Sequence, residues 1–508
     1  MSTEWEALNR QAIEHMQEGR FQEALEPARA AAEAARRDKG EGHLDLAVAL
    51  NNLGELYHAL GDFEAAESAI RESLAIYEKA YGAEHPELTD SLANLAELCM
   101  SRERYADAEP LVQRAIEIRE KALSADHPEL TPLLRALADV YHHQGRHEAA
   151  RQVLQRALSI LENAYGVDHP DLGAVLTSLA LIYQSEQNLE EAEPLFRRVL
   201  KIYEAKTGTD HPAFAAVLSY LAGIYLARGL FQAAEPFLNQ SLEIRRNTLP
   251  ANHPDIAESL DKLVMLYEAT GRPGEAESRM REVLAVYREG YGAEHPAAAQ
   301  AANNLGEHYL NQGRLDEARP LFESALAARE KSLGADHPAV AQSLNDLAVL
   351  TAQAGTPDDA EALHRRALAI RSKHYGEAHP AVTQSLENLA AVQRARGRID
   401  EAERLLRQSL SIWEKTVGTE HPATAQAMYN LATLMASVAR YGDAETLLQN
   451  ARRILEMSLG PQAVPLAMVY ETLSRVYEQR GDIEEAREYA ARAHKVRNPA
   501  QMQKPENN

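Results

Sequence analysis

The sequence is poor in cysteine, in aromatic residues and in long apolar runs, and each scarcity narrows what the chain can be. Cys99 is the only cysteine in 508 residues, which excludes an intramolecular disulfide and favours a reducing compartment. No stretch approaches the roughly 18 consecutive apolar residues of a membrane-spanning helix, and residues 1–20 lack the apolar core of a secretory signal. The net charge of -23 disfavours nucleic acid and anionic membranes as partners. We therefore expect a cytoplasmic protein that binds neither.

What the chain does have is a strict internal period. The dipeptide His-Pro recurs nine times at intervals of 42 residues, from 85–86 to 421–422. A leucine column with the same spacing begins at Leu53 and continues to Leu473. An alanine column has no exception and consists of Ala24, Ala66, Ala108, Ala150, Ala192, Ala234, Ala276, Ala318, Ala360, Ala402, Ala444 and Ala486. Such a period is the signature of a repeat architecture, and twelve units fill nearly the whole chain.

Each unit has the pattern of two helices. In 86–100 the apolar residues Leu88, Leu92, Leu95 and Cys99 step by four, three and four, which places them on one helix face. A break follows, which carries glycine in most units, and a second amphipathic run covers about 105–122. The pattern predicts a pair of antiparallel helices, and the alanine column predicts that the two helices cross closely. Because one such pair cannot bury its apolar faces, neighbouring pairs must stack.

The recurring histidine could belong to a metal site or to a structural joint. Successive copies are separated by two packed helices of roughly 8–10 Å each, so they cannot share a metal ion. Glycines such as Gly82 predict a left-handed cap at the end of one helix, and the proline begins the next helix. We therefore interpret the "YGAEHP" at 81–86 and 291–296 as a joint.

Other candidates for chemistry are weak. The cluster of His142, His143 and His147 contains the Gly145 turn, which should disrupt the spacing of a helical metal pair. Cys99 falls in a core column and predicts a packed, unreactive thiol. No phosphate loop, nucleophile elbow or zinc signature is present in the sequence. We expect no enzyme, no metal and no cofactor.

The runs "LANLAELCMSRERYADAEPLVQRAIEIREKAL" and "LNNLGELYHALGDFEAAESAIRESLAIYEKA" resemble the tetratricopeptide repeat. The 42-residue period and the "G..HP" ending resemble the variant in kinesin light chains and their bacterial relatives. The resemblance covers about residues 1–497. It implies an all-α, right-handed superhelical solenoid of about 12 helix-turn-helix repeats, whose first helices line a concave groove that binds peptides. It does not imply the kinesin role, since a basic groove for acidic tryptophan peptides is not evident.

The first helices carry a double ladder of amides at two positions four residues apart, which share a helix face. Amides both donate and accept, so the ladder could pair with the main chain of an extended peptide. Recent duplication of the repeats would explain the same pattern without any role in binding. The predicted peptide-binding residues are Asn52, Asn94, Gln300, Asn303, Asn304, Gln342, Asn345, Asp346, Gln384, Asn388, Gln426 and Asn430.

The middle of the groove is expected to be more apolar and to suit a hydrophobic anchor, through Leu181, Tyr220, Leu226 and Met265. Acidic residues outnumber basic ones along the predicted groove, which favours a neutral to basic extended segment as the partner. The acids are Glu55, Asp90, Glu97, Asp139, Glu258, Asp261, Glu307, Asp346 and Glu387, against Arg135, Lys262, Arg394 and Arg475.

We expect one solenoid over residues 1–497. It would consist of a degenerate capping repeat at 1–42, ten regular repeats at 43–462, a last repeat with its capping helix at 463–497, and then a disordered tail at 498–508. The leading hypothesis is a non-catalytic scaffold for a protein partner. The alternative is a regulatory, inhibitory or sensor subunit that controls a separately encoded effector enzyme.

Overall fold

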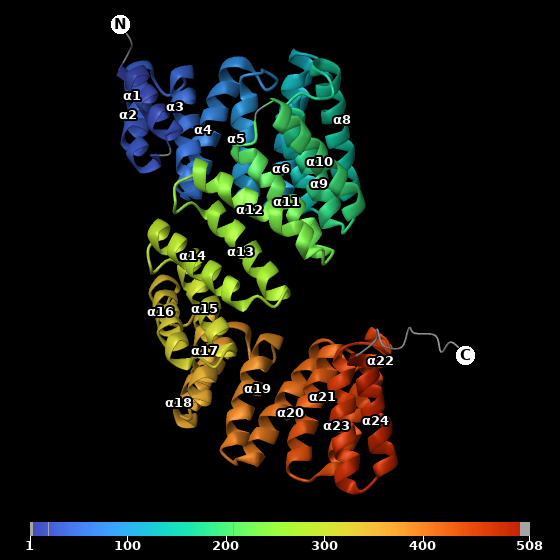
Figure 1. Ribbon diagram of the computed structural model, residues 1–508. Helices are drawn as coiled ribbons and strands as arrows, with labels where there is room; N and C mark the ends of the chain where they lie inside the picture. Colours follow the sequence, from blue (N-terminus) through green and yellow to red (C-terminus); the bar gives the residue numbers. More distant parts are fainter. Residues whose placement is uncertain (1–3, 19, 207, 498–508) are drawn as a thin grey trace, which may run out of the picture. The chain divides into compact units, whose positions relative to one another are not determined.

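The computed structural model describes residues 4–18, 20–206 and 208–497, and in this part of the chain it contains helices and no strand (Figure 1). The helices of the first half are α1 (Glu4–Gln17), α2 (Phe21–Lys39), α3 (Leu44–Ala59), α4 (Phe63–Tyr81), α5 (Leu88–Ser101), α6 (Tyr105–Ala122), the 3-10 turn η1 (Pro128–Leu130), α7 (Thr131–His143), α8 (His147–Tyr165), α9 (Leu172–Ser185), α10 (Leu189–Lys206), α11 (Pro212–Ala227) and α12 (Phe231–Thr248).

The second half repeats the same alternation of helices. It contains α13 (Pro254–Ala269), α14 (Pro273–Tyr291), α15 (Pro296–Asn311), α16 (Leu315–Leu333), α17 (Pro338–Gln353), α18 (Pro357–Tyr375), α19 (Pro380–Ala395), α20 (Ile399–Thr416), α21 (Pro422–Ser437), α22 (Tyr441–Leu459), α23 (Pro465–Arg480) and α24 (Ile483–Arg497). The expected helices at 86–100 and about 105–122 correspond to α5 and α6. The all-α repeat solenoid predicted from the period is confirmed.

The chain forms two compact units, Met1–Leu249 and Pro250–Asn508. In each unit the odd-numbered helix of a repeat packs on the even-numbered helix that follows, and the even-numbered helix packs on the next repeat (Figure 1). The single solenoid predicted over 1–497 stays a prediction, and the predicted tail 498–508 lies outside the described residues. Among the described helices, none is both long and apolar enough to cross a bilayer.

The alanine column forms the centre of each helix pair. Its members have exposed fractions of 0%, apart from Ala486 at 6%. A larger side chain at these positions would push apart the two helices of the repeat, which is the physical reason for the column. Cys99 is also buried, at 1% exposed, and burial raises the pKa of its thiol, in agreement with the predicted unreactive cysteine.

The joints between repeats follow the predicted pattern, with two corrections and one addition. The proline of the His-Pro dipeptide begins the next helix from α11 to α21 as predicted, but α5, α7 and α9 begin two or three residues after Pro86, Pro128 and Pro170. The glycines that end the second helices have φ between 87° and 92° but ψ between 152° and 168°. This region is open almost only to glycine, and it is not the left-handed helical conformation that we predicted. The chain therefore leaves the helix in an extended direction, toward the next first helix.

Histidine is the N-cap of seven first helices, a role that the sequence pattern did not indicate, and before α5, α7 and α9 it makes the same bond within the turn that precedes the helix. The Nδ1 atom accepts a hydrogen bond from the backbone N–H two residues later, at 3.1–3.3 Å in ten repeats, from His43 to His421. This bond satisfies one of the N–H groups left without a partner at a helix start. In "YGAEHP" the Tyr81 ring stacks on His85 with ring centroids 4.2 Å apart. The histidine column is thus a structural cap.

The turn inside each repeat also needs a positive φ. Eight glycines supply it, from Gly61 to Gly481, but Glu103, Gln187 and Ala439 occupy the same column with φ of 57°, 61° and 60°. Side chains other than glycine are strained in this conformation by roughly 1–2 kcal/mol. These three turns hold their shape because the surrounding repeat imposes it.

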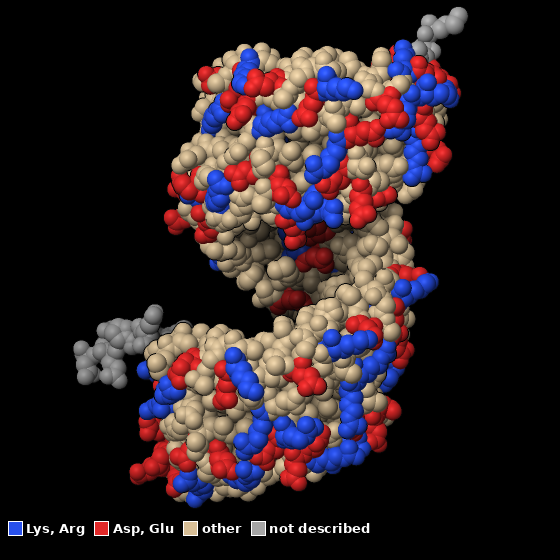
Figure 2. All heavy atoms as spheres, turned by 180° about the vertical axis from the view of Figure 1, so that it is seen from behind, with Lys and Arg blue, Asp and Glu red and all other residues tan. Residues whose placement is uncertain are grey.

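Ion pairs join second helices to the next repeat of the same unit. On the face drawn in Figure 2, basic and acidic side chains are interspersed over both units. A glutamate column on the second helices contacts arginines one repeat later, and its members are Glu67, Glu109, Glu193, Glu277, Glu361, Glu403 and Glu445. In one repeat the signs are exchanged, and Arg151 contacts Glu186. The column therefore ties neighbouring repeats by charge.

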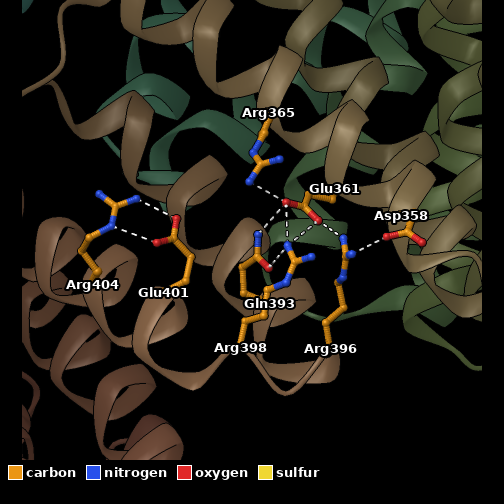
Figure 3. A network of polar contacts seen from close by, with 8 residues as sticks. All are labelled: Asp358, Glu361, Arg365, Gln393, Arg396, Arg398, Glu401 and Arg404. Carbon is orange, nitrogen blue, oxygen red and sulfur yellow. Dashed lines mark hydrogen bonds and ion pairs between the residues drawn. The ribbon is translucent and has the colours of Figure 1, made fainter.

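The most buried of these contacts surrounds Glu361 on α18 (Figure 3). Its side chain is 5% exposed and accepts hydrogen bonds or ion pairs from Arg396, from Arg398 at 3.3 Å and from Gln393 at 2.9 Å. Arg365 on its own helix lies 2.5 Å away. A carboxylate this deeply buried needs such donors, because its charge has lost most of its water.

Candidate functional site

The amide ladder lies on four consecutive first helices of the second unit, α15, α17, α19 and α21. In α15, α17 and α21 the first rung position donates to the second. The Nε2 atom of Gln300 lies 2.7 Å from Asn304 Oδ1, and Gln426 Nε2 lies 3.1 Å from Asn430 Oδ1. In α17 the acceptor is Asp346, at 2.8 Å from Gln342 Nε2. Gln300, Asn304, Gln384 and Gln426 are exposed, whereas Gln342, Asp346, Asn388 and Asn430 are partly exposed.

The second rung position also joins neighbouring repeats. The Nδ2 atom of Asn430 donates to Glu387 of the preceding repeat at 3.0 Å, and Asp346 accepts from Asn303 Nδ2 at 2.9 Å. In the first unit Asn52 makes the equivalent bond, from Nδ2 to Asn9 Oδ1 at 3.1 Å. These positions therefore have a structural task in addition to any role in binding. Asn388 has no hydrogen-bond partner among the described residues, and it is partly exposed.

Two predicted groove residues lie inside the protein instead. Asn303 and Asn345 are 1% and 2% exposed, so neither side chain is available to a peptide on the surface. Asn345 accepts a hydrogen bond from His364 Nδ1 at 2.8 Å and donates to Ser385 at 3.4 Å. Burial, and then the nearby Arg371, lower the pKa of His364 to about 4. The prediction failed for these two because one residue along a helix turns the side chain by about 100°.

Two buried arginines, which the sequence analysis missed, support the ladder from the second helices. Arg329 on α16 and Arg371 on α18 are 5% and 7% exposed. Arg329 donates to Gln300 Oε1 at 2.6 Å and to Ser343 at 2.6 Å. Burial lowers the pKa of both guanidinium groups, and nearby acids, Asp346 foremost, oppose this effect. The only sequence signal was arginine in a column that holds tyrosine or leucine in several other repeats.

The acids of the ladder are engaged with amides and hydroxyls rather than open to solvent. Burial raises the pKa of Asp346, and the hydrogen bonds from Asn303 and Gln342 lower it in part. Burial likewise raises the pKa of Glu387, against the donors Ser409 and Asn430. Counting acids along the sequence therefore overstates the negative charge that this part of the surface offers to a partner.

Two adjoining cavities extend the ladder toward the C-terminal end of the second unit. One of 280 Å³ is lined by Glu387, Asn388, Arg394, Asn430 and others, from α19 to α21. The next, of 610 Å³, shares Arg394 and is also lined by Tyr429, Tyr441 and Arg475. A third, of 500 Å³, lies at the other end of α17 and α19 and contains Gln342, Gln384, Tyr375 and Trp413. The ladder residues Gln342, Gln384, Asn388 and Asn430 thus border hollows of side-chain size.

The predicted apolar anchor residues belong to two different units. Leu181, Tyr220 and Leu226 lie in the first unit and are partly exposed. The Tyr220 ring packs on Phe196 with ring centroids 5.6 Å apart. Met265 lies in the second unit and is 61% exposed. Asn94, also in the first unit, is partly exposed.

The histidine cluster does not form a metal site in the described part of the chain. His142 Nδ1 lies 3.1 Å from His147 Nδ1, and His143 Nδ1 contacts the backbone oxygen of Asp139 at 2.8 Å. Burial, then His147 and His143, lower the pKa of His142. No group of three or more His, Cys, Asp or Glu residues among those described is arranged to hold a metal ion.

Several solved structures are similar to parts of this chain. A putative kinesin light chain with nearly identical TPR-like repeats from Podosopora anserina is 30% identical, with 41% of this chain and 98% of that chain covered and a TM-score of 0.37. BtubC (BKLC) from P. vanneervenii is 26% identical, with 45% and 92% covered and a TM-score of 0.39. The apo form of RapI is 14% identical, with 56% and 98% covered and a TM-score of 0.43. A search of curated proteins found no match.

Family models give the clearest result. A tetratricopeptide repeat model matches residues 6–79, 67–121, 87–163, 129–205, 213–289, 291–373, 381–456 and 436–498. A second tetratricopeptide repeat model matches residues 177–247. Repeats of this kind form scaffolds that are typical of protein–protein interaction. The matches cover most of the sequence, and the chain belongs to the tetratricopeptide repeat family.

Proposed function

We propose that the chain is a non-catalytic interaction scaffold that holds an extended, neutral to basic segment of a partner protein along the first helices of its second unit. The observation that carries the proposal is the row of amides on α15, α17, α19 and α21, together with the hollows beside it. An extended chain presents a main-chain carbonyl or N–H at regular intervals, which a row of amides can match. Adjacent hollows can accept side chains of the same segment.

Charge supports a basic rather than an acidic segment. Glu307 is exposed on this face and Asp346 is partly exposed, while the buried arginines are turned toward the ladder itself. The surface is therefore expected to accelerate encounter with basic segments, and salt should weaken that effect. The exposed Arg394 and Arg475 at the C-terminal end should favour a neutral or acidic group at that end of the bound segment.

The test uses fluorescent peptides of about a dozen residues with varied charge, titrated against the full chain at low and high salt. We expect binding of neutral and basic peptides, weakened by salt. Asn388→Ala should reduce affinity by roughly two- to tenfold, the effect of one hydrogen bond, because Asn388 lines the 280 Å³ cavity and has no partner of its own among the described residues. Tight binding of acidic peptides alone would contradict the proposed charge preference.

A matched control is Asn450→Ala on α22, an exposed asparagine on a second helix. It should leave both binding and helicity unchanged. If Asn388→Ala and Asn450→Ala bind equally well, the ladder is a product of repeat duplication with no part in binding.

A further inference from the structure

The two buried arginines each contact one ladder glutamine and the first helix of the next repeat. Arg329 donates to Gln300 Oε1 and to Ser343, and 42 residues later Arg371 donates to Gln342 Oε1 at 2.9 Å and to Ser385 at 2.9 Å. Both pairs therefore make the same contacts in consecutive repeats, with the guanidinium buried and the glutamine amide nearer the surface.

These contacts determine which way each glutamine amide faces. A guanidinium carries five N–H donors and no acceptor, so the atom that meets it must be the amide oxygen. The amide nitrogen of Gln300 is then turned toward Asn304, and its N–H is donated to Asn304 Oδ1 at 2.7 Å. The nitrogen of Gln342 is turned toward the carboxylate of Asp346, which can only accept.

Arg329 is decisive in the first of these rungs. Gln300 and Asn304 are both amides, and without an outside influence their mutual bond could run in either direction. With Arg329 in place, the oxygens of both amides are occupied, and the NH2 group of Asn304 has no partner among the described residues. This rung therefore presents N–H donors to the surface.

The two following repeats lack the arginine. The corresponding positions hold Trp413 and Leu455, and Gln384 and Gln426 have no guanidinium contact among the described residues. Trp413 lines the 500 Å³ cavity with Gln384. In those rungs the amides can present either the oxygen or the nitrogen.

We infer that Arg329 and Arg371 are positioning residues for the ladder amides. Arg329 makes the α15 rung a fixed N–H donor for a main-chain carbonyl oxygen of the bound segment, and Arg371 holds the Gln342 amide with its oxygen toward the guanidinium and its nitrogen toward Asp346. The α19–α21 part keeps amides that serve as donor or acceptor. This inference rests on the proposed function for its partner, while the orientation of the amides is a property of the chain alone. The α15 rung thus holds a main-chain carbonyl, and the α19–α21 part accommodates varied groups.

The first experiment needs no peptide. In the 15N-labelled chain, hydrogen exchange of the side-chain NH2 groups should be slow for Gln300 and fast for Asn304. Arg329→Met should make the two rates similar, because the pair can then reverse. Arg329→Lys keeps one donor and should restore the difference. Arg319→Met, at a partly exposed arginine of the same helix, is the matched control and should change nothing. An unchanged exchange pattern in Arg329→Met would overturn the positioning role.

The second experiment uses the peptides found in the binding screen, each resynthesised with single thioamides, whose sulfur is a weak acceptor. At one or more positions the thioamide should reduce affinity by roughly two- to tenfold in the wild-type chain. Arg329→Met should abolish that sensitivity and Arg319→Met should preserve it. Insensitivity at every position would overturn the assignment of carbonyl oxygens as the recognised group. If no peptide binds at all, the proposed function fails, whereas the exchange experiment still decides whether Arg329 orients the amides.

Discussion

The Glu361 cluster offers a quantitative test of how the repeats are held together. Replacing Glu361 by Gln removes the charge that faces Arg396, which is 18% exposed, and Arg398, which is 50% exposed. Breaking a fully buried pair costs about 3–5 kcal/mol, whereas pairs with exposed partners contribute about 0–1 kcal/mol. Since Glu361 is buried but two of its arginines reach water, and Arg396 keeps Asp358 (Figure 3), we expect a loss of about 2–3 kcal/mol in the free energy of unfolding.

The same figure contains the control. Glu401 lies 2.7 Å from Arg404 on α20, and their side chains are 35% and 62% exposed. Glu401→Gln should therefore lower the free energy of unfolding by no more than about 0.5 kcal/mol. Repeat arrays unfold in parts rather than all at once, so the probe must be local. Urea unfolding monitored by Trp413 fluorescence in a Trp5→Phe background reports on α20. Equal losses in the two variants would refute the argument from burial.

Three further changes test the histidines and the turns. His364 is buried and has a pKa of about 4, whereas a histidine in the unfolded chain has a pKa near 6.5. Its contribution to the free energy of unfolding is therefore complete above pH 6.5, and about 2 kcal/mol of it should be lost as the pH falls from 7 to 5. In urea titrations at several pH values, His364→Gln should remove this dependence on pH. Ala439→Gly should raise stability by about 0.5–1 kcal/mol in thermal unfolding, because Ala439 has φ of 60°. His337→Ala should lower the free energy of unfolding by about 1 kcal/mol. It should also accelerate hydrogen exchange of the Ala339 N–H, which donates to His337 Nδ1 at 3.1 Å.

The parts of the fold that depend on period and local chemistry could be predicted from the sequence. The helix pairs, the alanine contact and the joints follow from residues that act within one repeat. The histidine cap was missed because the residue before proline was considered only for its extended backbone and not for the acceptor in its side chain. The residue types are enough to predict a joint between two helices. Which backbone group a given side chain bonds to is known only from the atomic positions.

The candidate site was predicted less completely, for a geometric reason. The surface positions Gln300 and Gln426 follow from helix spacing, yet Asn303 and Asn345 lie on the inner side of the same helices. The buried Arg329 belongs to a second helix, and its contact with Gln300 spans 29 residues. A long side chain can be directed into the protein or toward solvent from the same backbone position, and periodicity does not distinguish these two directions.

The exchanged signs at Arg151 and Glu186 have a consequence for the inheritance of the gene. A tandem array of equal units can gain or lose a unit when repeated DNA recombines out of register. Loss of the unit that follows Arg151 would bring this arginine opposite the position of Arg228, because the column recurs every 42 residues, and two positive charges would then meet. Loss of the unit that follows Glu109 would likewise bring this glutamate opposite Glu186, so that two negative charges would meet. The order of units around Arg151 is therefore protected against deletion, and the length of the array is more easily varied elsewhere.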